Sequence, residues 1–263
     1  MNKLDLKLNE IKKRGKIGLM AHTVIGYPSL KKTYDIVLAM AEAGADIIEL
    51  QIPFSDPLAD GPTIMKACEQ SLRNGTKVKD AFQVAKKLSE KIKTPLLFMC
   101  YYNTVFKYGV ENFCADASEV GITGLIVPDM PLDEEKQEHF YEYARKYNLH
   151  TIRVISPAST DKRLKMNAEK ASGFVYSTAR QGITGARNNL DPTLNNYLNK
   201  VKKFFQIPLA VGFGISKKEH VEALVGHADI AIVGSALIDI INKANKKDLL
   251  TDVGKFIKSL QVE

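Results

Sequence analysis

The residues best suited to chemistry lie in one segment, IELQIPFSDPLADGP, residues 48–62. Glu49 belongs to a short apolar run typical of a buried strand. Side chains alternate between the two faces of a strand, so Glu49 and Gln51 share one face if Ile48 and Leu50 pack on the other. A partly desolvated carboxylate near the end of a strand is suited to general acid or base catalysis. The alternative is structural, with Glu49 forming an ion pair with a lysine.

Two further carboxylates, Asp56 and Asp60, follow in the loop that contains Pro57, Gly61 and Pro62. Asp60 is a second candidate for catalysis, but an acidic residue just before a helix that starts at Pro62 is also favoured by the helix dipole. Asp56 has a simple alternative as a turn residue. Neither aspartate is assigned a role by its position alone.

Two glycine-rich segments, VGFGIS (211–216) and VGSAL (233–237), each join a predicted strand to a predicted helix. Backbone N–H groups at such junctions bind anions, with the helix N-terminus adding its dipole. The net charge of +7 agrees with an anionic partner, and the two segments predict a phosphate site. A third segment, RQGITGARNNLDP (180–192), is long and polar, which predicts a closing lid with hinges at Gly182 and Gly185, or else a plain surface loop.

Eight short apolar runs predict the strands that must position these residues. They cover residues 17–24, 45–52, 95–102, 124–129, 150–156, 173–179, 207–213 and 228–235. Amphipathic segments between them predict helices, including 78–92, 133–147, 193–205, 216–225 and 235–260. Eight strands alternating with helices in 263 residues predict a (β/α)8 (TIM) barrel as one domain, with a doubly wound sheet as the runner-up. A barrel places chemistry at the C-terminal ends of its strands.

Local signals add detail to the predicted helices. Leu4, Leu8 and Ile11 have helical spacing and predict an extra N-terminal helix packed on the barrel. Ser216 followed by Glu219 predicts a capping box. In the segment 29–44, the expected buried face carries Tyr34, Val37, Leu38 and Ala41.

Composition narrows the class of protein. No apolar run reaches the roughly 18 residues that span a bilayer, and the start of the chain lacks the features of a signal peptide, so the cytoplasm is the expected location. Three cysteines without paired spacing and five scattered histidines give no indication of a disulfide framework or a metal site. Basic residues without interleaved aromatics argue against nucleic-acid binding.

The segment GADIIELQIPFSDPLADGPTI resembles the signature of the tryptophan synthase α subunit family. The resemblance extends through YYNTVFKYG, GLIVPDMP, GFVYSTARQGITGAR, VGFGIS and AIVGSALI, in order and over nearly the whole chain. It implies a (β/α)8 barrel that cleaves indole-3-glycerol phosphate to indole and glyceraldehyde 3-phosphate. It also implies an α2β2 complex with a β subunit that holds pyridoxal phosphate, while this chain holds no cofactor and no metal.

The resemblance also implies roles for individual residues. Glu49 resembles the catalytic acid or base, and Asp60 resembles its companion, which holds the indole N–H. The substrate and phosphate site would be formed by Tyr101, Asp129, Tyr176, Thr184, Gly185, Gly214, Gly234 and Ser235. Pro53 and Asp56 would lie in the loop that faces the β subunit.

Three residues depart from the pattern that the resemblance implies: Gln51 replaces a glycine, His22 replaces an aromatic residue, and Ala179 replaces a serine. By alternation Gln51 points the same way as Glu49, so we expect it to narrow the pocket or to bond a neighbour. His22 could stack on the indole and would add a pH dependence. The rival functions are another phosphate-binding barrel enzyme, a stand-alone indole-3-glycerol-phosphate lyase, and a weakly active regulatory subunit.

Overall fold

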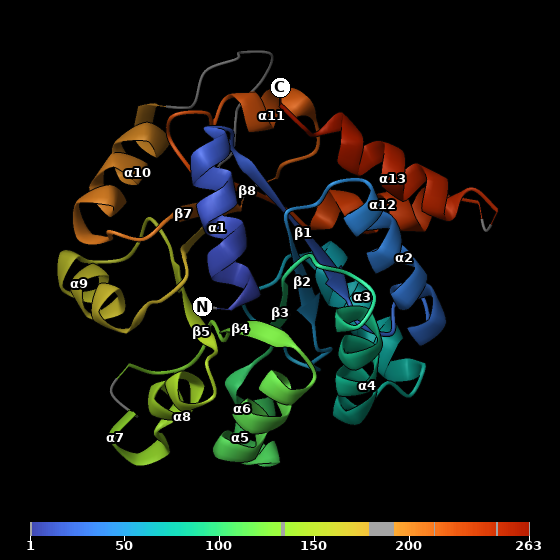
Figure 1. The fold of residues 1–263 in the computed structure, drawn as a ribbon, viewed down its shortest axis with the longest axis horizontal. Coiled ribbons are helices and arrows are strands. Elements are labelled where there is room, and N and C mark those ends of the chain that lie inside the picture. Colours follow the sequence, from blue (N-terminus) through green and yellow to red (C-terminus); the bar gives the residue numbers. More distant parts are fainter. Residues whose placement is uncertain (1, 133–134, 179–191, 213, 246, 263) are drawn as a thin grey trace.

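The computed structural model describes residues 2–132, 135–178, 192–212, 214–245 and 247–262. Eight parallel strands pair in sequence order, and β1 also pairs with β8, so the sheet closes into a barrel (Figure 1). The strands are β1 (Gly18–Val24), β2 (Ile47–Gln51), β3 (Leu96–Met99), β4 (Ile122–Ile126), β5 (His150–Ile155), β6 (Val175–Thr178), β7 (Leu209–Gly212) and β8 (Ile230–Val233). The predicted (β/α)8 barrel is confirmed, because helical crossovers join the parallel strands and the pairing of β1 with β8 closes the ring.

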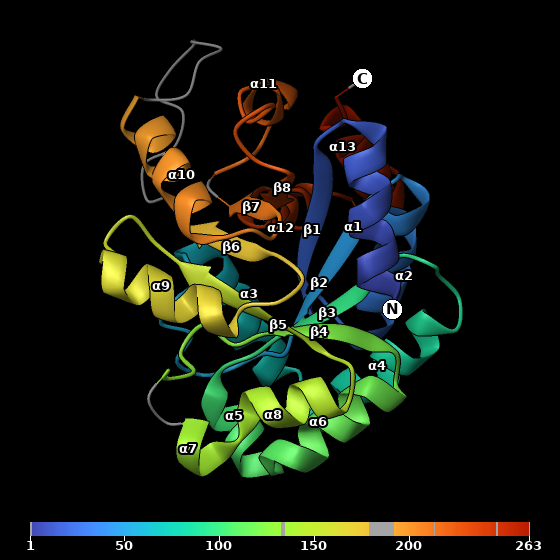
Figure 2. The same ribbon diagram turned by 60° about the vertical axis from the view of Figure 1, so that its left-hand side comes forward.

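Helices surround the strands as an outer ring, as Figures 1 and 2 show from two sides. They are α2 (Leu30–Glu42), α3 (Pro62–Arg73), α4 (Val78–Ser89), α5 (Tyr102–Tyr108), α6 (Val110–Glu119), α7 (Glu135–Glu138), α8 (Phe140–Lys146), α9 (Asp161–Lys170), α10 (Pro192–Phe204), α11 (Lys218–Glu222), α12 (Ser235–Lys243) and α13 (Leu249–Ser259). None of the helices in the described ranges is long and apolar enough to cross a membrane.

Helix α1 (Lys3–Arg14) lies outside this ring and closes the N-terminal end of the barrel. Leu4 and Ile11 are buried in the apolar cluster inside the barrel, and Leu8 packs against it. At the start of the helix, the Asn2 side chain donates to the Thr123 carbonyl oxygen at 3.0 Å. At its other end Arg14 pairs with Asp46 at 2.9 Å. The predicted N-terminal helix is therefore confirmed.

The core has two layers because side chains alternate along each strand. Ile48 and Leu50 of β2 face outward into the large cluster shared with the helices. Ile47 faces inward into the smaller cluster inside the barrel, which α1 closes. Glu49 is on the same inward face, as its spacing from Ile47 predicts.

Several predicted elements differ from the structure. The predicted helix 235–260 is two helices, α12 and α13, and the predicted helix 133–147 contains α7 and α8, separated by His139 in a left-handed conformation (φ 54°). β4 begins two residues earlier than predicted and ends at Ile126. The helix predicted at 216–225 is the shorter α11 in the structure, and no prediction covers α5, α6 or α9.

One local prediction was wrong, and another was only partly right. No capping box forms at Ser216, since α11 begins after Lys217 without a side-chain cap and the Ser216 N–H instead donates to His220 Nδ1 at 3.3 Å. In α2 the fully buried face carries Thr33, Ile36, Val37 and Met40. Tyr34, Leu38 and Ala41 are only partly buried against the core. The helix is rotated relative to the prediction because Ile36 and Met40 bury more apolar surface.

Candidate functional site

Glu49 lies near the C-terminal end of β2 and points into the barrel. Its strand neighbour on β1 is His22, and the His22 Nδ1 atom lies 3.3 Å from Glu49 Oε1. Both side chains are buried, with residue exposures of 4% for His22 and 3% for Glu49. The ion pair is therefore with a histidine and not with a lysine. The second oxygen, Glu49 Oε2, has no hydrogen-bond partner among the described residues.

The charge state of His22 depends on two opposing effects. Burial is the largest single effect and favours the neutral ring, whereas the neighbouring Glu49 carboxylate favours the protonated ring. Asp60 and Gln51 act in the same direction, and the pKa of His22 is raised above its ordinary value.

Asp60 reaches the same end of the barrel from the loop after β2. Its Oδ2 atom accepts hydrogen bonds from Gln51 Nε2 at 2.6 Å and from the Tyr101 hydroxyl at 3.1 Å. Burial raises the pKa of Asp60, and the two hydrogen bonds act in the opposite direction because they stabilise the ionised form. The expectation that Gln51 bonds a neighbour on the side of Glu49 is confirmed.

Tyr101, just after β3, anchors the loop that carries Asp60. Its hydroxyl accepts the Ala59 N–H at 2.9 Å while donating to Asp60, and its ring stacks on Phe54 at 5.2 Å between centroids. Burial raises the pKa of this hydroxyl, so it stays protonated and available as a donor. Tyr101 thus lies beside Asp60, consistent with a place in the site.

Tyr176 of β6 lines the opposite side of the interior. It packs against the inner cluster, and the carboxylates of Glu49 and Asp60 act on its hydroxyl electrostatically. Gly212 on the adjacent strand leaves room for the ring, because a Cβ there would lie 2.8 Å from the Tyr176 hydroxyl. The ring and the two carboxylates therefore face one space at the C-terminal end of the barrel.

Asp129 has a structural contact that the sequence did not indicate. Its Oδ1 atom accepts the Tyr102 N–H at 2.8 Å at the start of α5. The carboxylate thus satisfies one of the free N–H groups of a helix N-terminus. Asp129 is exposed, and no contact places it with Glu49 or Asp60.

The predicted phosphate residues are described in part. Gly234 is the N-cap of α12 and Ser235 its first residue, so unpaired backbone N–H groups of the first turn lie here. A Cβ at Gly234 would lie 3.7 Å from His22 Cβ, which places this junction beside the carboxylate site. Gly214 is exposed and left-handed (φ 48°). Thr184, Gly185 and the predicted lid 180–191 lie outside the described residues, as does Ala179.

The two predicted partner-facing residues differ in exposure. Asp56 is exposed and accepts a hydrogen bond from the Ser55 hydroxyl at 2.5 Å, whereas Pro53 is buried within this chain.

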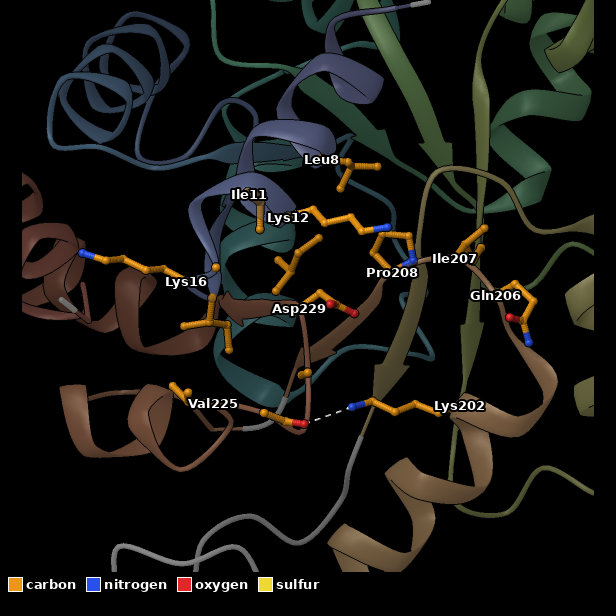
Figure 3. A pocket seen from close by; sticks show the side chains of 15 residues that line it. Leu8, Ile11, Lys12, Lys16, Lys202, Gln206, Ile207, Pro208, Val225 and Asp229 are labelled. Atoms are coloured by element: carbon orange, nitrogen blue, oxygen red, sulfur yellow. Dashed lines mark hydrogen bonds between the residues drawn. The ribbon is translucent and has the colours of Figure 1, made fainter.

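A separate cavity of about 400 Å³ lies at the other end of the barrel, between α1 and the start of β8 (Figure 3). Leu8, Ile11 and Pro208 line it together with Lys12 and Lys202. None of the candidate residues is among its lining residues, and in this fold chemistry belongs to the C-terminal ends of the strands. We therefore assign the site by its side chains and not by this cavity. Within the described ranges no group of three or more His, Cys, Asp and Glu side chains could hold a metal ion.

Sequence reasoning proposed Glu49, Asp60 and Tyr101 and expected a bond from Gln51, but it missed the contact of His22 with Glu49. Strand alternation predicted the direction of Gln51, while the pairing of His22 with Glu49 depends on the register between β1 and β2.

Comparisons with known proteins agree with this geometry. The family model described as "Tryptophan synthase alpha chain" matches residues 8–261. The chain is 46% identical over 258 residues to the tryptophan synthase alpha chain of Desulfotalea psychrophila, covering 98% of this chain and 99% of that one. It is 42% identical over 262 residues to that of a Thermoanaerobacter species, covering 99% of both.

Solved structures give the same result. The tryptophan synthase subunit alpha of Legionella pneumophila superposes with a TM-score of 0.90 at 30% identity, covering 99% of this chain and 97% of that one. A chain of the tryptophan synthase a2b2 complex from Pyrococcus furiosus has a TM-score of 0.85 at 36% identity, covering 94% and 97%. With the motifs, the barrel and the paired carboxylates in agreement, this chain belongs to the tryptophan synthase alpha chain family.

Proposed function

We propose that this chain is the α subunit of a tryptophan synthase and cleaves indole-3-glycerol phosphate to indole and glyceraldehyde 3-phosphate, as a carbon–carbon lyase. The observation that carries the proposal is the pair of carboxylates, Glu49 and Asp60, at the C-terminal end of the barrel in a chain of this family. The rival reading as another phosphate-binding barrel enzyme does not explain the family match over residues 8–261.

Cleavage of the substrate requires proton transfers at two positions. Carbon 3 of the indole gains a proton, the adjacent side-chain hydroxyl loses one, and the carbon–carbon bond breaks with its electron pair returning to the ring. We assign these transfers to Glu49, whose Oε2 atom is buried and unpartnered among the described residues.

Asp60 supports the ring while it carries positive charge. An ionised carboxylate that accepts the indole N–H stabilises that charge where it develops in the transition state. The hydrogen bonds from Gln51 and Tyr101 hold Asp60 in place and favour its ionised form.

We assign the phosphate of the substrate to backbone N–H groups at Gly214, Gly234 and Ser235, with Thr184 and Gly185 contributing from the predicted lid. The first turn of α12 supplies unpaired donors and a favourable dipole. Tyr176 would face the indole from β6. Asp129 is a weaker candidate for substrate binding, because its carboxylate already accepts the Tyr102 N–H at the start of α5.

We propose a β subunit as the partner, in an α2β2 complex in which that subunit holds pyridoxal phosphate and this chain holds no cofactor. The support is the solved a2b2 complex among the similar structures, together with two exposed apolar side chains that follow β2 and β3. Leu58 is 93% exposed in the loop after β2, and Phe106 is 55% exposed on α5. We also propose that residues 1–263 form one domain that acts in the cytoplasm.

The test is indole release from indole-3-glycerol phosphate, measured for the purified chain with and without a tryptophan synthase β subunit. Slow release alone and a strong increase with the partner are expected. Fast release without a partner would instead indicate a stand-alone lyase. No release in either condition from a folded protein would contradict the proposed reaction.

A further inference from the structure

The contact between His22 and Glu49 joins two inward-facing side chains of adjacent strands. Their residues are register neighbours, and Nδ1 of the ring lies 3.3 Å from Oε1 of the carboxylate. We propose that His22 is a positioning residue for Glu49, which holds Oε1 and leaves Oε2 as the oxygen that exchanges protons with the substrate. This inference rests on the proposed function, since it assigns the proton transfers to Glu49.

The two oxygens of Glu49 are used differently. Oε1 contacts the ring, whereas Oε2 is buried and has no partner among the described residues. A buried carboxylate oxygen without a partner costs stability, and such groups persist where they serve a function. Because one oxygen is fixed and the other is free, the carboxylate has a single orientation. A side chain that transfers protons as an acid or base requires such a fixed orientation.

The groups that face His22 favour its protonated form together. The carboxylates of Glu49 on β2 and Asp60 in the following loop favour the protonated ring, and Gln51 acts in the same direction. On the other flank, β8 ends at Val233, and the next residue, Gly234, lies beside His22 and brings no charge. Across the barrel Tyr176 is held as a neutral phenol, because burial raises its pKa.

The arrangement favours the protonated form of His22, whose positive charge offsets two carboxylates in a buried space. As the pH rises through the raised pKa of His22, the ring loses its proton and Glu49 loses a charged partner. We therefore expect kcat to fall on the alkaline side of pH 6.5, which is the ordinary pKa of histidine. This fall is called the alkaline step below. A residue that only filled space would not produce such a step.

The first test requires no substrate. NMR titration of the five histidines, with His22 assigned by its absence in His22→Asn, should give a His22 pKa above 6.5 that falls in Glu49→Gln. A His22 pKa at or below 6.5, or one that Glu49→Gln leaves unchanged, would overturn the inference. Because this measurement does not depend on cleavage, it separates failure of this inference from failure of the proposed function.

The second test compares two substitutions by pH profile. His22→Phe removes the contact with Oε1 and should lower kcat about 10- to 100-fold, the range for a lost hydrogen bond to a charged group, with a smaller effect on KM. His22→Asn retains a donor near the position of Nδ1 but does not titrate. It should therefore keep more of the kcat than His22→Phe, and both variants should lose the alkaline step.

The matched control is His139→Asn, which removes another His–Glu pair, with Glu142 at 3.0 Å, on the surface of α8. Asparagine tolerates the left-handed backbone at this position (φ 54°). The control should keep both kcat and the alkaline step. An alkaline step that persists in folded His22→Phe, or kcat unchanged in that variant, would overturn the inference.

Discussion

At the scale of single residues, the site is a set of polar side chains that constrain one another. Glu49 is held from one strand by His22, and Asp60 is held by Gln51 and Tyr101. Each carboxylate therefore has its own environment, and different environments are what allow two carboxylates to take different roles.

We expect Glu49→Gln to lower kcat by about 10² to 10⁴, the range for a lost acid or base, which corresponds to roughly 3–5 kcal/mol of barrier. The amide keeps the shape of the side chain but cannot exchange the proton. Asp56→Asn is the control, since Asp56 is exposed and its substitution should leave kcat unchanged when no β subunit is present. Steady-state indole release measures both. Turnover near that of the parent in folded Glu49→Gln would exclude Glu49 as the acid or base.

Gln51→Leu should move the acid limb of the pH profile to higher pH. The Gln51 hydrogen bond lowers the pKa of Asp60, so its loss raises that pKa and leaves less of the ionised carboxylate at a given pH. The profile of kcat against pH below neutrality tests this. An unshifted acid limb would show that ionisation of Asp60 does not control turnover.

At the scale of elements, helices position the site from both ends of the barrel. Helix α1 seals the N-terminal end, and the N-terminus of α12 lies beside the carboxylates at the other. Substitutions in α1 should therefore affect stability, and substitutions at the start of α12 should affect substrate binding.

We expect Leu4→Ala to lower the free energy of unfolding by about 2–5 kcal/mol, because it leaves a cavity inside the barrel where Leu4 is fully buried. Leu6→Ala on the same helix is the control, since Leu6 is 54% exposed and should change stability by less than about 0.5 kcal/mol. Denaturant unfolding followed by circular dichroism gives both values. Equal stabilities would show that α1 does not close the core.

Gly234→Asp should raise KM for indole-3-glycerol phosphate, because it places a negative charge at the start of α12 against the phosphate. Gly234→Ala is the control for size: the nearest atoms to a Cβ there are 3.6 Å away, an ordinary contact, so this variant should fold and bind more nearly as the parent does. An unchanged KM in folded Gly234→Asp would rule out the phosphate assignment at this position.

At the scale of the whole molecule, the barrel gathers the candidate site and the proposed partner surface at one end. Leu58→Asp should reduce stimulation of indole release by the β subunit, with little effect on release by the chain alone, because Leu58 is 93% exposed. Leu6→Asp, at the opposite end of the barrel, should leave the stimulation unchanged. Equal stimulation of both variants would place the partner elsewhere.

The sequence by itself determined the architecture and most of the candidate site. Alternating apolar runs and amphipathic segments predicted the barrel, because burial of apolar faces at periods of 2 and 3.6 dictates strands and helices. Alternation placed Glu49 and Gln51 on one face, and their inward direction followed from the expectation that Ile48 and Leu50 pack against the helices. The breaks in the helices at residues 139 and 244–248, and the start of β4, were missed because local periodicity is insensitive to where the chain must turn to pack on its neighbours.

Only the tertiary structure decided which side chains meet. His22 and Glu49 are 27 positions apart in the sequence, and their contact exists because the register between β1 and β2 places them side by side. The tertiary structure likewise gave Asp129 its contact with the N–H of Tyr102 and placed Pro53 in the interior. Contacts of this kind depend on strand pairing and loop closure between distant segments, which no local pattern of residue types specifies.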